Sequence, residues 1–172
     1  MKVPIDLQCV WSDIQAIKKS YLLIHIITNY VVVESTANGL LAIGASLIIA
    51  HALDVVNIAS SLVLNIGTLS PFWIQGMMVA LKAADSKSTP IILDPVGAGA
   101  TSYRTKTAHS ILDPGTVEVI RGNPSGIASL AITDTQALAS GDKFLMPKAI
   151  SSMKERLLSI TTVFNSQSIR SL

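Results

Sequence analysis

The chain has 172 residues, of which 49% are hydrophobic and only 14% charged, and its formal net charge is +2. This length suits one domain with room for a tail and excludes two large domains. The high hydrophobicity and low charge exclude an intrinsically disordered chain.

The first expected element is an amphipathic helix near the start of the chain. Apolar residues recur at helical spacing from Leu7 to Ile17. Lys18 and Lys19 follow, and cations suit the C-terminus of a helix. The pattern predicts an opening helix that ends near these lysines.

Short apolar runs bounded by polar or turn residues come next, and each is typical of a buried strand. These runs are Leu22 to Ile27, Leu47 to Ala50, Leu62 to Ile66, Ile91 to Leu93 and Val117 to Ile120. Helix-compatible stretches lie between them, at Val33 to Ile43, Ala52 to Ser60, Pro71 to Ser86 and Arg104 to Leu112. Strands of this kind, separated by helices, indicate βαβ units. The predicted fold class is α/β, with a mostly parallel sheet flanked by helices.

The pattern degrades after Asp134. Ser151 to Ile160 is compatible with one amphipathic helix, whereas Thr161 to Leu172 has no clear period. We therefore predict a domain over residues 1–134 and a divergent tail over 135–172. Residues 1–141 carry eight Lys/Arg and nine Asp/Glu, and residues 142–172 carry five and two, so the positive charge lies in the tail. Without a regular basic face, this surplus argues against a nucleic-acid partner.

The longest stretch without charged residues, Val55 to Leu81, is long enough to span a bilayer. Polar residues divide it into short pieces, so we expect no membrane span. No basic region leads an apolar one at the start, and a cytoplasmic location is therefore the default expectation. The single cysteine, Cys9, is expected to be an ordinary small apolar residue.

Ligands of open α/β sheets bind beyond the carboxyl ends of the strands, which makes the residues after each apolar run candidates for a site. Asp94 ends one run and Gly97-Ala98-Gly99 follows it. A buried carboxylate beside a glycine-rich loop suits a magnesium and phosphate site. The alternative is a simple turn with glycines at positive φ, and the sequence leaves both interpretations open.

Arg121 follows the last run and precedes Asn123 and Pro124, residues typical of a helix N-cap and first position. An arginine beside a helix N-terminus suits a bidentate contact with phosphate. An ordinary surface ion pair is the alternative. The three histidines are too scattered for a metal motif or a catalytic triad, and we expect structural or surface roles for them: His25, His51 and His109.

Five segments, taken in chain order, resemble the hydroxyethylthiazole kinase family. They are His25 to Asn29, Thr36 to Ser46, Asn65 to Leu69, Leu93 to Ala100 and Ile120 to Asn123. The resemblance covers about residues 7–130. It implies a ribokinase-like fold, a homotrimer with substrate at subunit boundaries, and phosphorylation of 4-methyl-5-(2-hydroxyethyl)thiazole in thiamine biosynthesis or salvage. The implied co-substrate is ATP and the implied cofactor is Mg²⁺.

The resemblance also implies roles for individual positions. Asp94 matches an aspartate near magnesium, and Arg121 matches an arginine that contacts ATP phosphates, with Asn123 in the same motif. The substrate-binding positions are Asn29, Asn38, Gly67 and Ile49, of which Ile49 stands where the family usually has methionine.

Three departures from the family pattern define further expectations. Gly126 stands where the family has a glutamate near magnesium. The stretch between Ile49 and Asn65 is about one helical turn shorter than usual. A Gly-x-Gly-Cys turn, which in the family stabilises the transferring phosphoryl group, does not occur in the 172 residues. We therefore expect a truncated member without the C-terminal part of the fold, and we assign no catalytic residue.

The leading hypothesis is a truncated hydroxyethylthiazole kinase, which by itself is expected to form little or no phosphorylated product. The first alternative is a non-catalytic remnant that binds the thiazole or associates with other subunits. A second alternative is a decayed gene product whose incomplete sheet exposes an edge and aggregates.

Overall fold

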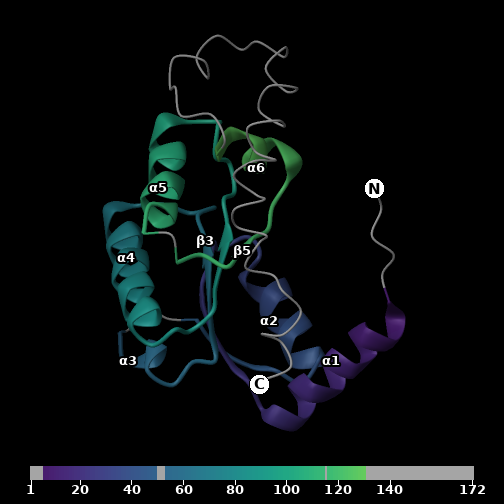
Figure 1. Ribbon diagram of the computed structural model, residues 1–172. Coiled ribbons are helices and arrows are strands. Elements are labelled where there is room, and N and C mark those ends of the chain that lie inside the picture. The colour runs from purple at the N-terminus through teal and green to yellow at the C-terminus, as the bar shows by residue number, and fades with distance from the viewer. Residues whose placement is uncertain (1–5, 50–52, 115, 131–172) are drawn as a thin grey trace.

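The computed structural model describes residues 6–49, 53–114 and 116–130, and these residues form a five-stranded parallel sheet with helices on both sides (Figure 1). The strands are β1 (Leu23–Ile27), β2 (Ser46–Ile49), β3 (Ser61–Asn65), β4 (Ile91–Asp94) and β5 (Val119–Ile120). Their order across the sheet is β2-β1-β3-β4-β5. All four strand pairs are parallel, which confirms the predicted α/β class.

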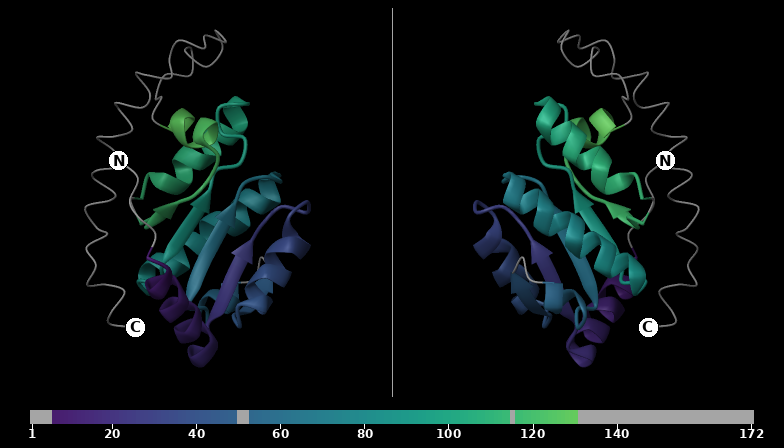
Figure 2. Two further views of the ribbon diagram at one scale, coloured as in Figure 1. Left: turned by 90° about the vertical axis from the view of Figure 1, so that its right-hand side faces the viewer. Right: turned by 90° about the vertical axis from the view of Figure 1, so that its left-hand side faces the viewer.

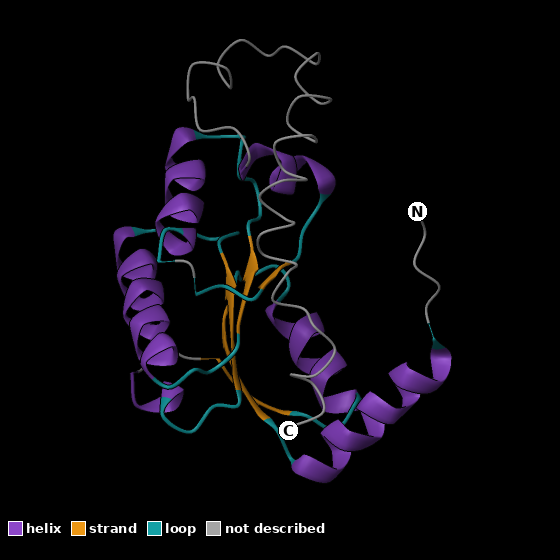
Figure 3. Ribbon diagram, viewed as in Figure 1, coloured by secondary structure: helices purple, strands orange, loops and turns teal. Residues whose placement is uncertain are grey.

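Helices alternate with the strands along the chain. They are α1 (Leu7–Ser20), α2 (Val33–Ala42), α3 (Leu53–Val56), α4 (Pro71–Ser86), α5 (Ser102–Leu112) and α6 (Pro124–Leu130). The four helices from α2 to α5 each connect two successive strands, as a parallel sheet requires. Figure 1 shows α3, α4 and α5 on one side of the sheet and α2 on the other. Figure 3, coloured by secondary structure, separates these helical layers from the strands between them.

The sheet has a topological switch point between β1 and β3. From β1 the chain crosses through α2 to β2 on one side, and from β2 it returns through α3 to β3 on the other side. Right-handed crossovers in opposite directions place their helices on opposite faces of a sheet. The loops after β1 and β3 therefore diverge, and such a crevice is where open α/β sheets bind ligands.

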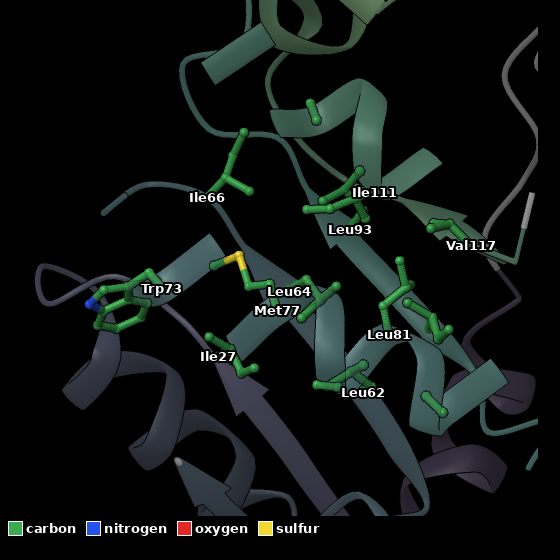
Figure 4. Close-up of a cluster of buried hydrophobic side chains, with 14 of the residues drawn as sticks. Ile27, Leu62, Leu64, Ile66, Trp73, Met77, Leu81, Leu93, Ile111 and Val117 are labelled. Carbon is green, nitrogen blue, oxygen red and sulfur yellow. The ribbon is translucent and has the colours of Figure 1, made fainter. Parts of the chain in front are cut away.

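The face of the sheet beneath α3, α4 and α5 is closed by a hydrophobic core (Figure 4). Helix α4 begins at Pro71, and the Ser70 hydroxyl accepts a hydrogen bond from the Trp73 backbone N–H at 3.3 Å. The helix then buries residues at helical spacing: Trp73, Met77, Ala80, Leu81 and Ala84. From the strands, the fully buried side chains are Ile27, Leu62, Leu64, Ile91 and Leu93.

Alternate strand residues point to the opposite face, where one row of apolar side chains crosses all five strands. The register aligns the members of this apolar row, in the order of the strands: Ile49, Ile26, Val63, Ile92 and Val119. Ile26 is buried, Val63 and Ile92 are half-buried, and Ile49 is exposed. This face is covered less completely than the one beneath α4.

The predicted elements agree with the described ones to within a few residues, and the opening helix is confirmed as α1. The expectation that every apolar run is a buried strand is wrong for β2. Strand β2 lies at the edge of the sheet, where Ser46 and Ile49 are exposed. Helix α3 is four residues long and therefore shorter than the helix expected over Ala52 to Ser60.

Helix α1 buries none of its side chains, and Trp11 is exposed. Figure 2 shows α1 at the end of the sheet where the strands begin. The expectation of an apolar role for Cys9 is wrong, because this residue is exposed and its thiol donates to Asp6 Oδ2 at 3.2 Å. Among the described residues, no helix is long and apolar enough to cross a bilayer. The predicted tail over 135–172, with its helix Ser151 to Ile160, and His51 lie outside the described residues.

Candidate functional site

A pocket of about 520 Å³ lies at the carboxyl ends of β1, β3 and β4, beside the switch point. Three members of the apolar row form part of its wall: Ile26, Val63 and Ile92. Two positions further along the chain, on the same face, come Thr28, Asn65, Asp94 and Arg121, which also line it. We call these four residues the polar row. The pocket is therefore apolar along the sheet and polar beyond the strand ends.

Hydrogen bonds connect the polar row from β3 to the end of β5. Asn65 and Asp94 are register partners, and Asn65 Nδ2 donates to Asp94 Oδ2 at 3.0 Å. Arg121 donates to the same Oδ2 through a terminal guanidinium nitrogen at 2.6 Å, which forms an ion pair. Among the described residues, both hydrogen bonds to the Asp94 side chain reach Oδ2 and none reaches Oδ1.

Asn29 extends this network to the loop after β1. Its Nδ2 donates to Asn65 Oδ1 at 2.8 Å. Its own Oδ1 accepts from the backbone N–H groups of Val31 and Val32 at 3.0 and 3.1 Å. Asn29 thus fixes the segment that leads into α2 and holds it against β3. All donors in the chain from Asn29 through Asn65 point toward the Asp94 carboxylate, which fixes the orientation of both side-chain amides.

Gly67 lines the pocket at a point that leaves no room for a side chain. Its backbone N–H donates to Asn65 Oδ1 at 2.8 Å. A Cβ atom at this position would lie 2.5 Å from Asn29 Nδ2 and 2.9 Å from Asn65 Oδ1. Only glycine allows the loop after β3 to approach the two asparagines this closely.

The electrostatics of the pocket centre on Asp94, whose side chain is only 11% exposed. Burial raises the pKa of this carboxyl above its ordinary value, and the Arg121 guanidinium and the Asn65 amide oppose that rise only in part. The Arg121 side chain is 75% exposed, so most of its N–H donors face solvent while one edge holds Asp94. The site therefore combines a desolvated acceptor with an accessible cation.

The loop after β4 turns sharply beside the pocket. The backbone N–H of Ala98 donates to the Pro95 carbonyl oxygen at 3.0 Å, and Gly97 and Gly99 have φ values of 71° and 87°. These are the positive φ values that the turn interpretation of Gly97-Ala98-Gly99 predicts. The next helix, α5, begins after Thr101, whose hydroxyl accepts from the Arg104 backbone N–H at 3.3 Å.

The structure brings four of the predicted site residues together around the pocket: Asn29, Gly67, Asp94 and Arg121. Three others lie outside its wall. Asn38 is exposed on α2, and Asn123 is exposed just before α6. Ile49 is 42% exposed on β2, although it belongs to the apolar row and is the register partner of Ile26.

Sequence reasoning marked the segment Asn65 to Leu69 but assigned no site role to Asn65, and it assigned none to Arg104. Asn65 ends an apolar strand as the register partner of Asp94, and a polar residue in that place becomes a recognisable signal once the strand pairing is known. Arg104 reaches the site through backbone carbonyls, which leave no mark in the sequence.

Other candidates lie away from the pocket. His25 is fully buried in β1, and His109 is half-buried on α5, so neither lines the pocket. Gly126 is buried in α6, where an added Cβ would lie 3.2 Å from the Pro95 carbonyl oxygen. Within the described ranges, no group of three or more His, Cys, Asp or Glu side chains is placed to hold a metal ion.

Comparison with known proteins identifies a family that matches most of the chain. A model of the hydroxyethylthiazole kinase family matches residues 14–153. The chain is 54% identical over 130 residues to a hydroxyethylthiazole kinase of Syntrophus aciditrophicus, and this match covers 73% of this chain and 48% of that protein. It is 44% identical over 135 residues to a protein of the same name from Leptothrix cholodnii, which covers 76% and 49%.

Among solved structures, a hydroxyethylthiazole kinase protein from Pyrococcus horikoshii OT3 is similar, with a TM-score of 0.72 and 36% sequence identity. The match covers 86% of this chain and 58% of the other. The chain spans about half the length of the curated relatives it matches.

Proposed function

Because this chain belongs to the hydroxyethylthiazole kinase family, we propose that its pocket binds 4-methyl-5-(2-hydroxyethyl)thiazole for ATP-dependent phosphorylation of the alcohol. The observation that carries the proposal is the hydrogen-bonded network from Asn29 through Asn65 to Asp94 and Arg121. It sets polar groups suited to phosphoryl transfer at one end of an apolar pocket.

The pocket suits a small aromatic alcohol. Its volume of about 520 Å³ lies within the range of roughly 300–1,000 Å³ that is usual for small-molecule sites. The apolar row offers branched aliphatic side chains to a methylated ring. The polar row offers hydrogen-bonding groups to a hydroxyl. We propose Asn29 and Gly67 as the residues that shape the substrate side, with Asn38 and Ile49 as flanking positions.

The described residues fit a magnesium ion of the kind that accompanies ATP. Mg²⁺ is commonly bound through one or two carboxylates together with water and substrate phosphates, so a full protein cage is not required. Asp94 supplies one such carboxylate, and its Oδ1 carries no hydrogen bond from the described residues. When bound there, the ion would neutralise charge on the phosphates.

Arg121 is placed to hold phosphate oxygens. One terminal nitrogen is engaged by Asp94, while the exposed remainder of the guanidinium keeps donors directed at solvent. A guanidinium presents five N–H donors in a fixed plane, which suits contact with phosphate. We propose that Arg121 contacts ATP in this way and that Asn123, in the same segment, lies along the ATP side.

Phosphoryl transfer depends on positioning and charge neutralisation more than on covalent help from the protein. In this site, Asn29 and Asn65 orient Asp94, Asp94 orients Arg121, and the apolar row positions the ring. For the transfer, the hydroxyl group of the thiazole must lie in line with the terminal phosphate of ATP, and water must be excluded from the pocket. These are the tasks that the described residues can perform.

A second candidate function is thiazole binding, or association with other subunits, without catalysis. Gly126 favours it, because the resemblance places a glutamate near magnesium at this position. An added Cβ at Gly126 would lie 3.2 Å from the Pro95 carbonyl oxygen, which leaves little room for that glutamate. For the association with other subunits, we propose the homotrimer that the family resemblance implies.

The test measures binding and chemistry separately. Calorimetry with the thiazole alcohol in the absence of ATP is expected to show binding heat. Phosphorylated product is then measured with Mg-ATP, for the unmodified chain and for D94N. Binding with product that D94N abolishes supports the kinase. Binding without product supports the second function. If no binding heat is measured, both proposals for the pocket, the kinase and thiazole binding without catalysis, are contradicted.

A further inference from the structure

The Arg104 side chain connects two loops of the pocket. From α5, one terminal nitrogen donates to the Ile66 and Val96 carbonyl oxygens at 2.9 and 3.0 Å. The other donates to the Gly67 carbonyl oxygen at 3.0 Å. Ile66 and Gly67 belong to the loop after β3, and Val96 belongs to the loop after β4.

Both loops form the wall of the pocket, because Gly67 and Val96 line it. Gly67 is held from two sides: its N–H donates to Asn65 Oδ1, and its carbonyl accepts from Arg104. The loop after β3 is therefore tied to the polar row at one peptide group and to the loop after β4 at the next.

The local backbone leaves room for this arrangement. A Cβ atom on Gly97 would lie 3.0 Å from Arg104 Cδ, so the absence of a side chain at residue 97 lets the arginine stem pass beneath the turn. Among the described residues, the ion pair of the structure joins Arg121 to Asp94, and no carboxylate lies within ion-pair distance of Arg104. Within the part of the chain that the structure describes, the hydrogen bonds of the Arg104 side chain all go to backbone oxygens.

We propose that Arg104 is a positioning residue that sets the separation of the loops after β3 and β4, and thereby the width of the thiazole pocket. A planar guanidinium can bridge three carbonyl oxygens at fixed angles, whereas an ammonium group cannot reproduce this fork. The role rests on the proposed function, since it concerns the affinity of that pocket for its ligand.

The test compares R104A and R104K with the unmodified full chain, and K106M serves as the matched control. Lys106 is an exposed cation two residues further along α5. Calorimetry measures thiazole binding without ATP, and far-UV circular dichroism checks the fold. We expect R104A to weaken binding by about tenfold or more, because it removes three charge-assisted hydrogen bonds that hold the two loops in place. We expect K106M to leave binding unchanged.

Chemical rescue separates positioning from a general loss of structure. Guanidinium ion at millimolar concentration is expected to restore part of the affinity of R104A, because the ion can occupy the space between the three carbonyls. Sodium chloride at equal ionic strength is expected to restore none. Unmodified affinity in R104A, or a folded R104A that guanidinium fails to restore, would overturn the proposal. Should R104A not fold, unmodified affinity in R104K overturns it.

A measurement without ligand keeps this proposal separate from the proposed function. Absence of thiazole binding by the unmodified chain would contradict the function and leave Arg104 to be tested by amide hydrogen exchange. Faster exchange of the Gly67 N–H in R104A, but not in K106M, is the expected result. Unchanged protection of that amide would contradict the positioning role.

Discussion

The two faces of the sheet differ although the same strands form both. Leu64 points into the core beneath α4 and has no exposed surface, whereas its neighbour Val63 points the other way and is half-buried in the pocket wall. One face gains its stability from removing apolar surface from water. The pocket face leaves part of its apolar surface exposed, and a ligand can cover that surface. The strands therefore support the fold with one set of alternate residues and the site with the other.

The difference between the two faces is tested most directly by truncating Leu64 and Val63, which are neighbours on β3. L64A is expected to lower the free energy of unfolding by about 2–5 kcal/mol, as large-to-small changes in closed cores do. V63A is expected to cost only about 1 kcal/mol, because part of its surface is already in contact with solvent. Urea denaturation measures both, and equal losses would show that the pocket face is as closed as the core face.

A side chain added at Gly67 tests the pocket face of the sheet in the same way. The new Cβ of G67A would collide with Asn29 Nδ2 and displace the loop or the amide. We expect a loss of about 1–3 kcal/mol in stability, typical of overpacking, together with thiazole binding weakened by about tenfold or more. Calorimetry and thermal unfolding measure the two effects. Unaltered binding would separate Gly67 from the pocket.

Replacement of Asp94 is expected to change the stability of the chain by an amount that depends on pH. Because burial raises the pKa of its carboxyl in the folded state, the folded chain holds this proton more tightly than the unfolded chain. The stability that Asp94 contributes is present below the unfolded pKa of about 4 and is lost as pH rises through the folded pKa. D94N should therefore be more stable than the unmodified chain at neutral pH.

The control for this prediction is the acidic range, where Asp94 is protonated in both states. The gain in the unfolding midpoint of D94N is expected to vanish there. A variant less stable than the unmodified chain at pH 7 would show that the ion pair with Arg121 outweighs burial.

The smallest expected effect lies at Gly39 of α2, a residue that belongs neither to the core nor to the pocket wall. Gly39 is exposed, and no atom lies within 4 Å of where its Cβ would be. G39A should raise the free energy of unfolding by about 0.5–1 kcal/mol, because alanine favours a helix interior over glycine. It should not alter thiazole binding, which makes it the matched control for G67A in the same assays.

Local patterns were sufficient for the elements of this fold. The bounds Pro71–Ser86 of α4 follow from an N-cap serine, a proline at the first position and helical spacing of apolar residues. The edge position of β2 was not readable, because the apolar run Leu47 to Ala50 resembles that of a central strand. Strand order depends on pairing between distant segments, which no local pattern records.

The candidate site shows the same limit. Asp94 and Arg121 stood out because a charge at the end of an apolar strand is unusual. Asn65 became a site residue only when the register placed it beside Asp94. Arg104 contacts backbone oxygens, so its partners have no sequence signature. Positions taken from the family resemblance remain predictions, and three of them, Asn38, Ile49 and Asn123, lie beyond the pocket wall.

The parallel pairing of all the strands also has a kinetic consequence. Ile24 pairs with Ser61, so β1 gains its partner β3 only after α2, β2 and α3 have been synthesised. The described strands pair only in parallel, so none of them forms a hairpin with its neighbour early in folding, and non-local pairings of this kind slow folding. At synthesis rates of about 5–20 residues per second, β1 waits for seconds on the ribosome with unpaired edges. We therefore expect co-expressed chaperones to raise the yield of folded chain.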